Sequence, residues 1–414
     1  MDRPGSSVGV VVSDVQVMET RTGVRLSARL RGAGVPATLW FEVPAGCGEA
    51  LSPRGDPFLP PLLMHSLVHP GPVVIEADLS PHLVTSVKRI AALLEDWNLP
   101  PDRARNPVVD IRGPLVAPAH RGAAVGAFFS GGVDSFYTVL KNIARYPTTD
   151  TRALTHLVML HGFDVREEDA ALFARLSGPL RDAATALGRG FLPVRTNVRE
   201  LFGSDDLDFT HGAVLAGVAH AIAGLFHTLY VASSYPYSEL RPWGSHPVLD
   251  PLWCSERLDY VHDGAERSRP EKIAFISSSP VALRALRVCW MQRDAYNCGK
   301  CEKCIRTMLG LAAHGVLEQA TAFPPGLTPA DVEAVFVPEF IRIRWEDICR
   351  ELRHREPELV RAAERALARS ERVDAVWWAL GRIGITRARA QTLDRALLGG
   401  AGRGLWRRLL WRGR

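Results

Sequence analysis

Two adjacent glycines lie between an apolar run and a helical pattern in Gly126-Ala127-Phe128-Phe129-Ser130-Gly131-Gly132-Val133-Asp134-Ser135. A strand that turns into a helix in this way points backbone N–H groups and the positive helix end at one place, where phosphate can bind. Glycine lets an anion approach because no Cβ lies in the way. Ser130 and Ser135 can add hydroxyl donors. Asp134 is either a helix cap or a ligand of a magnesium ion that bridges to the phosphates.

Four of the seven cysteines crowd into one short segment, at Cys289, Cys298, Cys301 and Cys304. Thiolates this close along the chain can meet one tetrahedral ion with little loop-closure cost. Zinc and an iron–sulfur cluster both suit two-residue spacings between cysteines. Four protein ligands would leave a zinc ion no open position, so such a site would be structural.

Gly131 and Gly132, with the residues beside them, are called the glycine turn below. The segment around this turn alternates between strand-like apolar runs and helical patterns. Repeated strand–helix units predict the α/β class, with a parallel sheet covered by helices and ligands outside the carboxyl ends of its strands. The expected strands are 125–129, 154–160, 191–195 and 228–233, and the expected helices are 136–145, 169–187 and 212–226.

The pattern differs on either side of this segment, which predicts three domains. Residues 1–121 carry short alternating apolar runs separated by Gly and Pro, typical of a β-rich domain. Residues 122–323 form the α/β domain with the cysteines. Residues 324–414 are predicted to be a helical region, with helices at 329–335 and 344–370 and a basic tail.

Composition favours a globular protein of the cytoplasm. Apolar residues make up 47% and charged residues 23%, no secretory signal opens the chain, and no run of eighteen apolar residues predicts a membrane span. The net charge of the chain is +5, and positive charge is concentrated late in the chain, where leucines and tryptophans are interspersed with arginines at 399–414. This tail fits a solvated helix best; binding to anionic lipid is an alternative, and binding to nucleic acid is only weakly supported.

The string Ser130-Gly131-Gly132-Val133-Asp134-Ser135 resembles the PP-loop of the N-type ATP pyrophosphatases, and no Gly-Lys-Ser/Thr of a Walker loop follows it. The resemblance implies an adenine nucleotide alpha hydrolase-like fold that binds ATP and Mg²⁺ and splits ATP into AMP and pyrophosphate. The cysteine spacing downstream is similar to the zinc site of 7-cyano-7-deazaguanine synthase and its relatives. This similarity favours Zn²⁺ over iron and sulfide.

The resemblance also implies roles for particular residues. The adenine is expected along Met159, Leu160 and His161, at the end of the second strand of the α/β domain. Asp134 and Ser135 are expected to act in catalysis. By analogy with the cation clamps of phosphoryl chemistry, Arg269 and Lys272 are expected to neutralise phosphate charge.

The expected reaction activates a carboxylate or amide-like oxygen by adenylation, after which ammonia or an amine displaces AMP. The acceptor is a small molecule or a protein, and a homo-oligomer is possible. The charged and aromatic stretch 238–253 does not match the substrate motif of the deazaguanine synthases, so it is either an acceptor-recognition loop or a salt-bridged surface loop. Two other functions stay open: a sulfurtransferase with an iron–sulfur cluster, and a nucleotide-binding partner module without catalysis.

Overall fold

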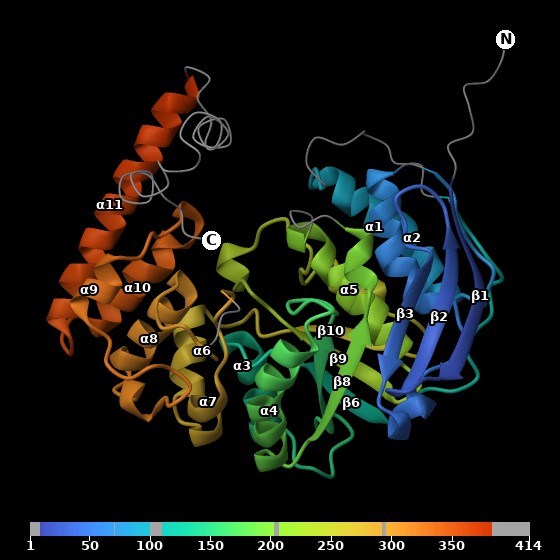
Figure 1. The fold of residues 1–414 in the computed structure, drawn as a ribbon, viewed down its shortest axis with the longest axis horizontal. Coiled ribbons are helices and arrows are strands. Elements are labelled where there is room, and N and C mark those ends of the chain that lie inside the picture. Colours follow the sequence, from blue (N-terminus) through green and yellow to red (C-terminus); the bar gives the residue numbers. More distant parts are fainter. Residues whose placement is uncertain (1–8, 70, 100–109, 203–206, 292–294, 383–414) are drawn as a thin grey trace. The chain divides into compact units, whose positions relative to one another are not determined.

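The structure is a computed structural model that describes residues 9–69, 71–99, 110–202, 207–291 and 295–382. The chain divides into two compact units, 1–268 and 269–414. The first unit contains a large sheet and its helices, and the second is helical (Figure 1). Each unit is described by itself below.

The first unit is built on a ten-stranded sheet with the order β10-β9-β6-β7-β8-β3-β2-β1-β4-β5. The pairs β1–β2, β2–β3 and β3–β8 are antiparallel, and the other neighbours are parallel. The predicted α/β class with a mostly parallel sheet is therefore confirmed. The strands are β1 (Val10–Glu19), β2 (Val24–Arg31), β3 (Thr38–Val43), β4 (Val73–Ile75), β5 (Ile111–Arg112), β6 (Ala124–Phe128), β7 (His156–His161), β8 (Gly190–Thr196), β9 (Phe226–Ala232) and β10 (Asp259–Asp263).

The direction in which strands are added reverses beside β6. The chain runs from β6 through α3 (Val133–Arg145) to β7, and through α4 (Ala170–Ala186) to β8. It then returns through α5 (Leu207–Ala221) to β9, which pairs with the opposite side of β6. In open parallel sheets, ligands bind outside the carboxyl ends of the two strands that flank such a reversal. Here those strands are β6 and β9.

The N-terminal strands extend this same sheet. In β3, Phe41 and Glu42 pair with Thr196 and Arg195 of β8. The buried Asn197 amide reinforces the junction, because it accepts a hydrogen bond from the Trp40 N–H (3.0 Å) and donates one to the Thr38 carbonyl (2.8 Å). The strands on both sides of the expected boundary at 121/122 therefore belong to one sheet, and the three-domain division stays a prediction.

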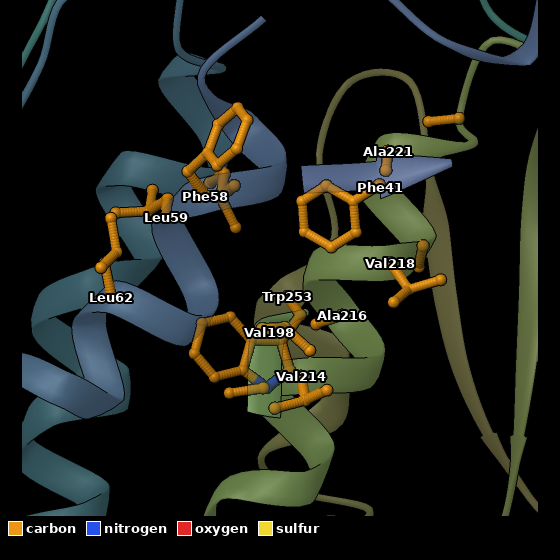
Figure 2. Close-up of a cluster of buried hydrophobic side chains, with 14 of the residues drawn as sticks. Phe41, Phe58, Leu59, Leu62, Val198, Val214, Ala216, Val218, Ala221 and Trp253 are labelled. Carbon is orange, nitrogen blue, oxygen red and sulfur yellow. The ribbon is translucent and has the colours of Figure 1, made fainter. Parts of the chain in front are cut away.

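One face of the sheet packs on α1 (Leu59–Val68), α2 (Pro81–Asp96) and α5. Figure 2 shows side chains of α1 and α5 meeting Phe41 of β3 in this core. The ring centroids of Phe41 and Phe58 are 5.7 Å apart. Burying a side chain of this size contributes about 1.5–3 kcal/mol relative to its exposure. This core therefore joins the N-terminal strands to the central part of the chain.

The other face of the sheet packs on α3 and α4. Two residues of β10 show that the helices cover both faces: the Tyr260 hydroxyl bonds the Gly212 carbonyl of α5, while Asp263 bonds Thr138 of α3. Residues separated by an odd number of positions along a strand point to opposite faces.

The second unit consists of helices around the buried Trp345. The helix predicted at 344–370 is two helices, α10 (Arg342–Leu352) and α11 (Pro357–Arg382). Pro357 lacks an N–H and its ring blocks helix continuation, so it begins a new helix. The other helices are α6 (Arg269–Ile276), α7 (Pro280–Ala285), α8 (Glu302–Ala313) and α9 (Pro329–Glu333). Within the described residues, no helix is long and apolar enough to cross a membrane, and the basic tail at 399–414 lies outside them.

Candidate functional site

The glycine turn follows β6 directly and ends at the first residue of α3, Val133. Gly131 has a φ of +76°, which glycine adopts without strain. Gly132 is the N-cap and has no side chain with which to bond the first N–H groups of the helix. The Ser135 hydroxyl donates to the Gly132 carbonyl (3.0 Å), and the exposed Ser130 hydroxyl accepts from the Gly132 N–H (3.4 Å).

Asp134 does not cap α3, because Gly132 occupies the cap position. The carboxylate belongs instead to the first turn of the helix, where its charge is favourable toward the helix dipole. Of the two roles predicted from the sequence, cap or magnesium ligand, the cap role is wrong. The magnesium role stays a prediction.

A network of polar side chains attaches α3 to the end of β10. Thr138 donates to Asp263 (2.8 Å), and Lys141 contacts both Asp263 (2.8 Å) and Glu266 (2.7 Å). Tyr137 also donates to Glu266 (2.8 Å). These contacts hold α3, and with it the glycine turn, in register with the carboxyl edge of the sheet.

The charges in this network are stabilised by their partners. Burial alone would lower the pKa of Lys141, but its hydrogen bonds to Asp263 and Glu266 raise it. Burial alone would raise the pKa of Glu266, but hydrogen bonds from Lys141 and Tyr137 lower it to about 2. Both groups are therefore charged in neutral solution. No local pattern in the sequence predicts these contacts, because Asp263 and Glu266 each lie 125 positions along the chain from a partner in α3.

The predicted adenine contacts lie at the carboxyl end of β7. Met159 and His161 are buried and Leu160 is half-buried. The His161 ring stacks on Phe173 of α4 at 4.3 Å between centroids, and its Nε2 lies 3.0 Å from the Arg166 carbonyl oxygen. Burial lowers the pKa of His161 and favours the neutral ring. His161 thus fixes β7 to α4, and its contact with a nucleotide stays a prediction.

Gly162 allows the chain to turn sharply just after β7. Its φ is +99°, and a Cβ at this position would lie 1.7 Å from the Thr196 carbonyl oxygen of β8. A side chain here would therefore strain the backbone and push β7 and β8 apart at the edge where the glycine turn lies.

Gly162→Ala is expected to destabilise the protein by about 2 kcal/mol or more, since a positive φ alone costs a non-glycine residue about 1–3 kcal/mol. Thermal unfolding followed by circular dichroism measures the change. Gly178→Ala is the matched control, because a Cβ at Gly178, in α4, meets nothing within 4 Å. Equal melting temperatures for the two variants would contradict this account of Gly162.

Residues of the stretch 238–253 pack among aromatic rings near the end of β9. The Arg241 guanidinium lies over Tyr235 (4.6 Å) and over Trp243 (4.8 Å), and Trp243 also contacts His211 of α5 (5.8 Å). This region is therefore ordered by stacking. Its role in recognising an acceptor stays a prediction.

Arg269 and Lys272 belong to α6 of the second unit, and Lys272 is 1% exposed. Their predicted action on phosphate stays a prediction.

The four cysteines meet as predicted. Their sulfur atoms all lie within 4.8 Å of one another. The Cys298–Cys304 and Cys289–Cys301 sulfur separations are 3.9 and 4.0 Å. Zn–S bonds of about 2.3 Å in a tetrahedron put the sulfurs about 3.8 Å apart, so the donor set fits zinc.

Backbone and amide groups position the cysteines. The N–H groups of Lys300 and Cys301 point at the Cys298 sulfur (3.4 and 3.2 Å). The buried Asn297 accepts from the Cys289 N–H (3.2 Å) and donates to the Leu286 and Ala322 carbonyls (2.8 Å each). Such outer contacts orient ligands and are a regular part of metal sites.

No family model, curated protein or solved structure matches this chain. Its function is therefore inferred from the residues and geometry of the chain.

Proposed function

We propose that this chain is an ATP pyrophosphatase of the PP-loop class, which adenylates a carboxylate or amide-like oxygen so that a nitrogen nucleophile can displace AMP. The observation that carries the proposal is the position of Ser130–Ser135. The string follows β6, one of the two strands at the reversal of the parallel sheet, and opens α3 without a side-chain cap.

The order of the central strands supports the proposal. Read from β8, they run β8-β7-β6-β9-β10, which is 3-2-1-4-5 when they are numbered along the chain. This is the doubly wound order in which nucleotides bind at the reversal, on the turn after the first strand. Here that turn is the Ser-Gly-Gly-x-Asp-Ser string.

The chemistry assigns separate tasks to the residues of the turn. The backbone of Gly131 and Gly132 and the hydroxyls of Ser130 and Ser135 would receive the pyrophosphate oxygens. Asp134 would hold a magnesium ion, which neutralises phosphate charge when it is bound. Catalysis would come mainly from orienting the acceptor oxygen toward the α-phosphorus and from stabilising the leaving pyrophosphate.

The cysteine site supports a zinc-containing member of the class. Four sulfur ligands close the coordination shell, so the ion would hold the second unit together and would not activate water. The sulfurtransferase alternative requires iron and sulfide at the same four residues, and metal analysis separates the two.

The cleavage position tests the proposal with two analogues of ATP. An enzyme that splits the bond between the α- and β-phosphorus atoms should cleave β,γ-imido-ATP to AMP and imidodiphosphate, but should leave α,β-methylene-ATP intact. Both are expected to bind the full-length protein with magnesium, as measured by calorimetry, with products identified by mass spectrometry. Formation of ADP from ATP, or binding of neither analogue, would contradict the proposal.

A further inference from the structure

A buried carboxylate–imidazole pair lies at the carboxyl end of β10. Asp250 Oδ2 is 2.7 Å from His262 Nδ1, and the two side chains are 0% and 4% exposed. A carboxylate at this distance accepts a hydrogen bond, so Nδ1 carries a proton, and in the neutral ring Nε2 is then an acceptor. Within the part of the chain that the structure describes, His262 Nε2 is buried without a hydrogen-bond partner.

Several donors fix the Asp250 carboxylate. Ser245 Oγ donates to Oδ2 (2.6 Å), and the His246 N–H approaches Oδ1 at 3.3 Å. The loop that carries them is pressed onto α5: the Gly244 N–H bonds the Asp208 carbonyl (3.1 Å), and a Cβ on Gly212 would lie 1.8 Å from the Gly244 carbonyl oxygen. The direction of the His262 ring is therefore set by the fold.

Ser245 is not a nucleophile activated by this histidine. Its hydroxyl lies 3.5 Å from Nδ1, on the side of the ring that faces Asp250. In a Ser-His-Asp triad, the serine is on Nε2 and the carboxylate on Nδ1. Nε2, on the other side of the ring, is the His262 atom left for a group from outside this cluster.

A buried polar atom without a partner costs about 1–3 kcal/mol, and such atoms in native proteins call for an explanation. The hydrogen bond to the buried Asp250 carboxylate explains the presence of the imidazole, but it uses Nδ1 and leaves the cost at Nε2 in place. A ligand that donates an N–H or O–H hydrogen bond to Nε2 would explain why this buried atom has no partner within the protein.

Strand register places the backbone of His262 two strands away from the residues that lead into the glycine turn, and its side chain lies on the α5 face of the sheet, as that of Tyr260 does. Ala127 of β6 pairs with Tyr230 of β9, and the next residue of β9, Val231, pairs with His262. His262 is therefore level with Phe128, two residues before Ser130. With about 4.8 Å between strands, the two positions are about 10 Å apart across the sheet.

We propose that His262 Nε2 accepts the proton that the nitrogen nucleophile loses, with Asp250 as the positioning residue; this rests on the proposed function. As the nitrogen lone pair forms a bond to the adenylated carbon, the N–H proton passes to Nε2. The bond from that carbon to the AMP oxygen breaks, and AMP leaves with the electron pair. Asp250 stabilises the imidazolium that results, and a later deprotonation restores the neutral ring.

The test uses the full-length protein with ¹⁵N-labelled histidine side chains, the magnesium complex of α,β-methylene-ATP, which the proposed reaction leaves intact, and hydroxylamine or ammonium chloride as the nitrogen probe. Long-range NMR should show His262 protonated at Nδ1, and Nε2 should shift on addition of either probe but not of sodium chloride. Asp250→Asn should abolish the fixed tautomer. His262→Gln identifies the signal, and His156→Gln, at the amino end of β7, is the matched control.

A ring protonated at Nε2, or an Nε2 signal that neither probe moves, would overturn the role of His262. Pyrophosphate release from ATP by the wild type reports on the proposed function separately. Pyrophosphate release together with a His262 signal that neither probe moves would contradict the role of His262 and leave the proposed function standing. A His262 signal that the probes move, without cleavage of ATP, would support a ligand site at Nε2 and would contradict adenylation by this protein.

Discussion

Asp134→Ala is expected to lower the rate of pyrophosphate release from magnesium–ATP by about 10²–10³-fold, the range seen when one preorganised electrostatic group is lost from an active site. Gly132 caps α3, so the carboxylate is not needed to start the helix. Its loss should cost about 0.3–1 kcal/mol of stability through the helix dipole. A large effect on turnover with a small effect on melting is therefore the expected signature.

The measurement is a steady-state assay of pyrophosphate at several magnesium concentrations. Asp182→Ala is the matched control, because Asp182 is an exposed acid on α4, on the same face of the sheet as α3. Asp134→Asn keeps the size of the side chain and should also be slow, since a neutral amide is a poor magnesium ligand. Pyrophosphate release that does not depend on residue 134 would rule out this turn as the site.

Removing the metal is expected to unfold the second unit. Zinc held by several sulfur or nitrogen ligands contributes about 10–16 kcal/mol of apparent binding free energy in small zinc domains, and that energy is also folding energy. Protein purified without oxygen should contain about one zinc per chain, from the ligand number of a single site. Cys298→Ser should lose the metal and a large part of the cooperative unfolding transition.

Metal content by mass spectrometry and thermal unfolding by calorimetry check this prediction. Cys47→Ser is the control, because Cys47 is a half-buried cysteine of the first unit outside the sulfur cluster. Iron with sulfide in the purified protein would favour the sulfurtransferase function instead. A metal-free protein with an unchanged transition would show that the four thiols need no ion.

The sequence predicts best what short stretches of chain decide. The run 125–129 is buried and strand-like, and the glycines that follow permit the turn, so β6 and α3 are visible without a structure. The four cysteines are close along the chain and need only one loop to meet. In both cases the residues that interact are neighbours in sequence.

What the sequence does not show depends on pairing between distant segments. Phe41 and Thr196 meet across β3 and β8, and nothing in either strand specifies the other as its partner. For the same reason, the strands before residue 122 read as a separate β-rich domain. The contact between Asp250 and His262 is likewise not predicted from the sequence, because it depends on how the loop before Asp250 packs on α5.

The pairing of β3 with β8 means that the N-terminal strands cannot be removed without exposing an edge of the central sheet. Without β3, the backbone N–H and C=O groups of β8 would lie on an open edge, and such an edge recruits other strands and promotes aggregation. The pairing also joins residues more than 150 positions apart, and contacts this distant form slowly during folding. The strands β1 to β5 therefore cover the β8 edge of the central strands, and a shortened chain that begins at β6 would leave that edge unpaired.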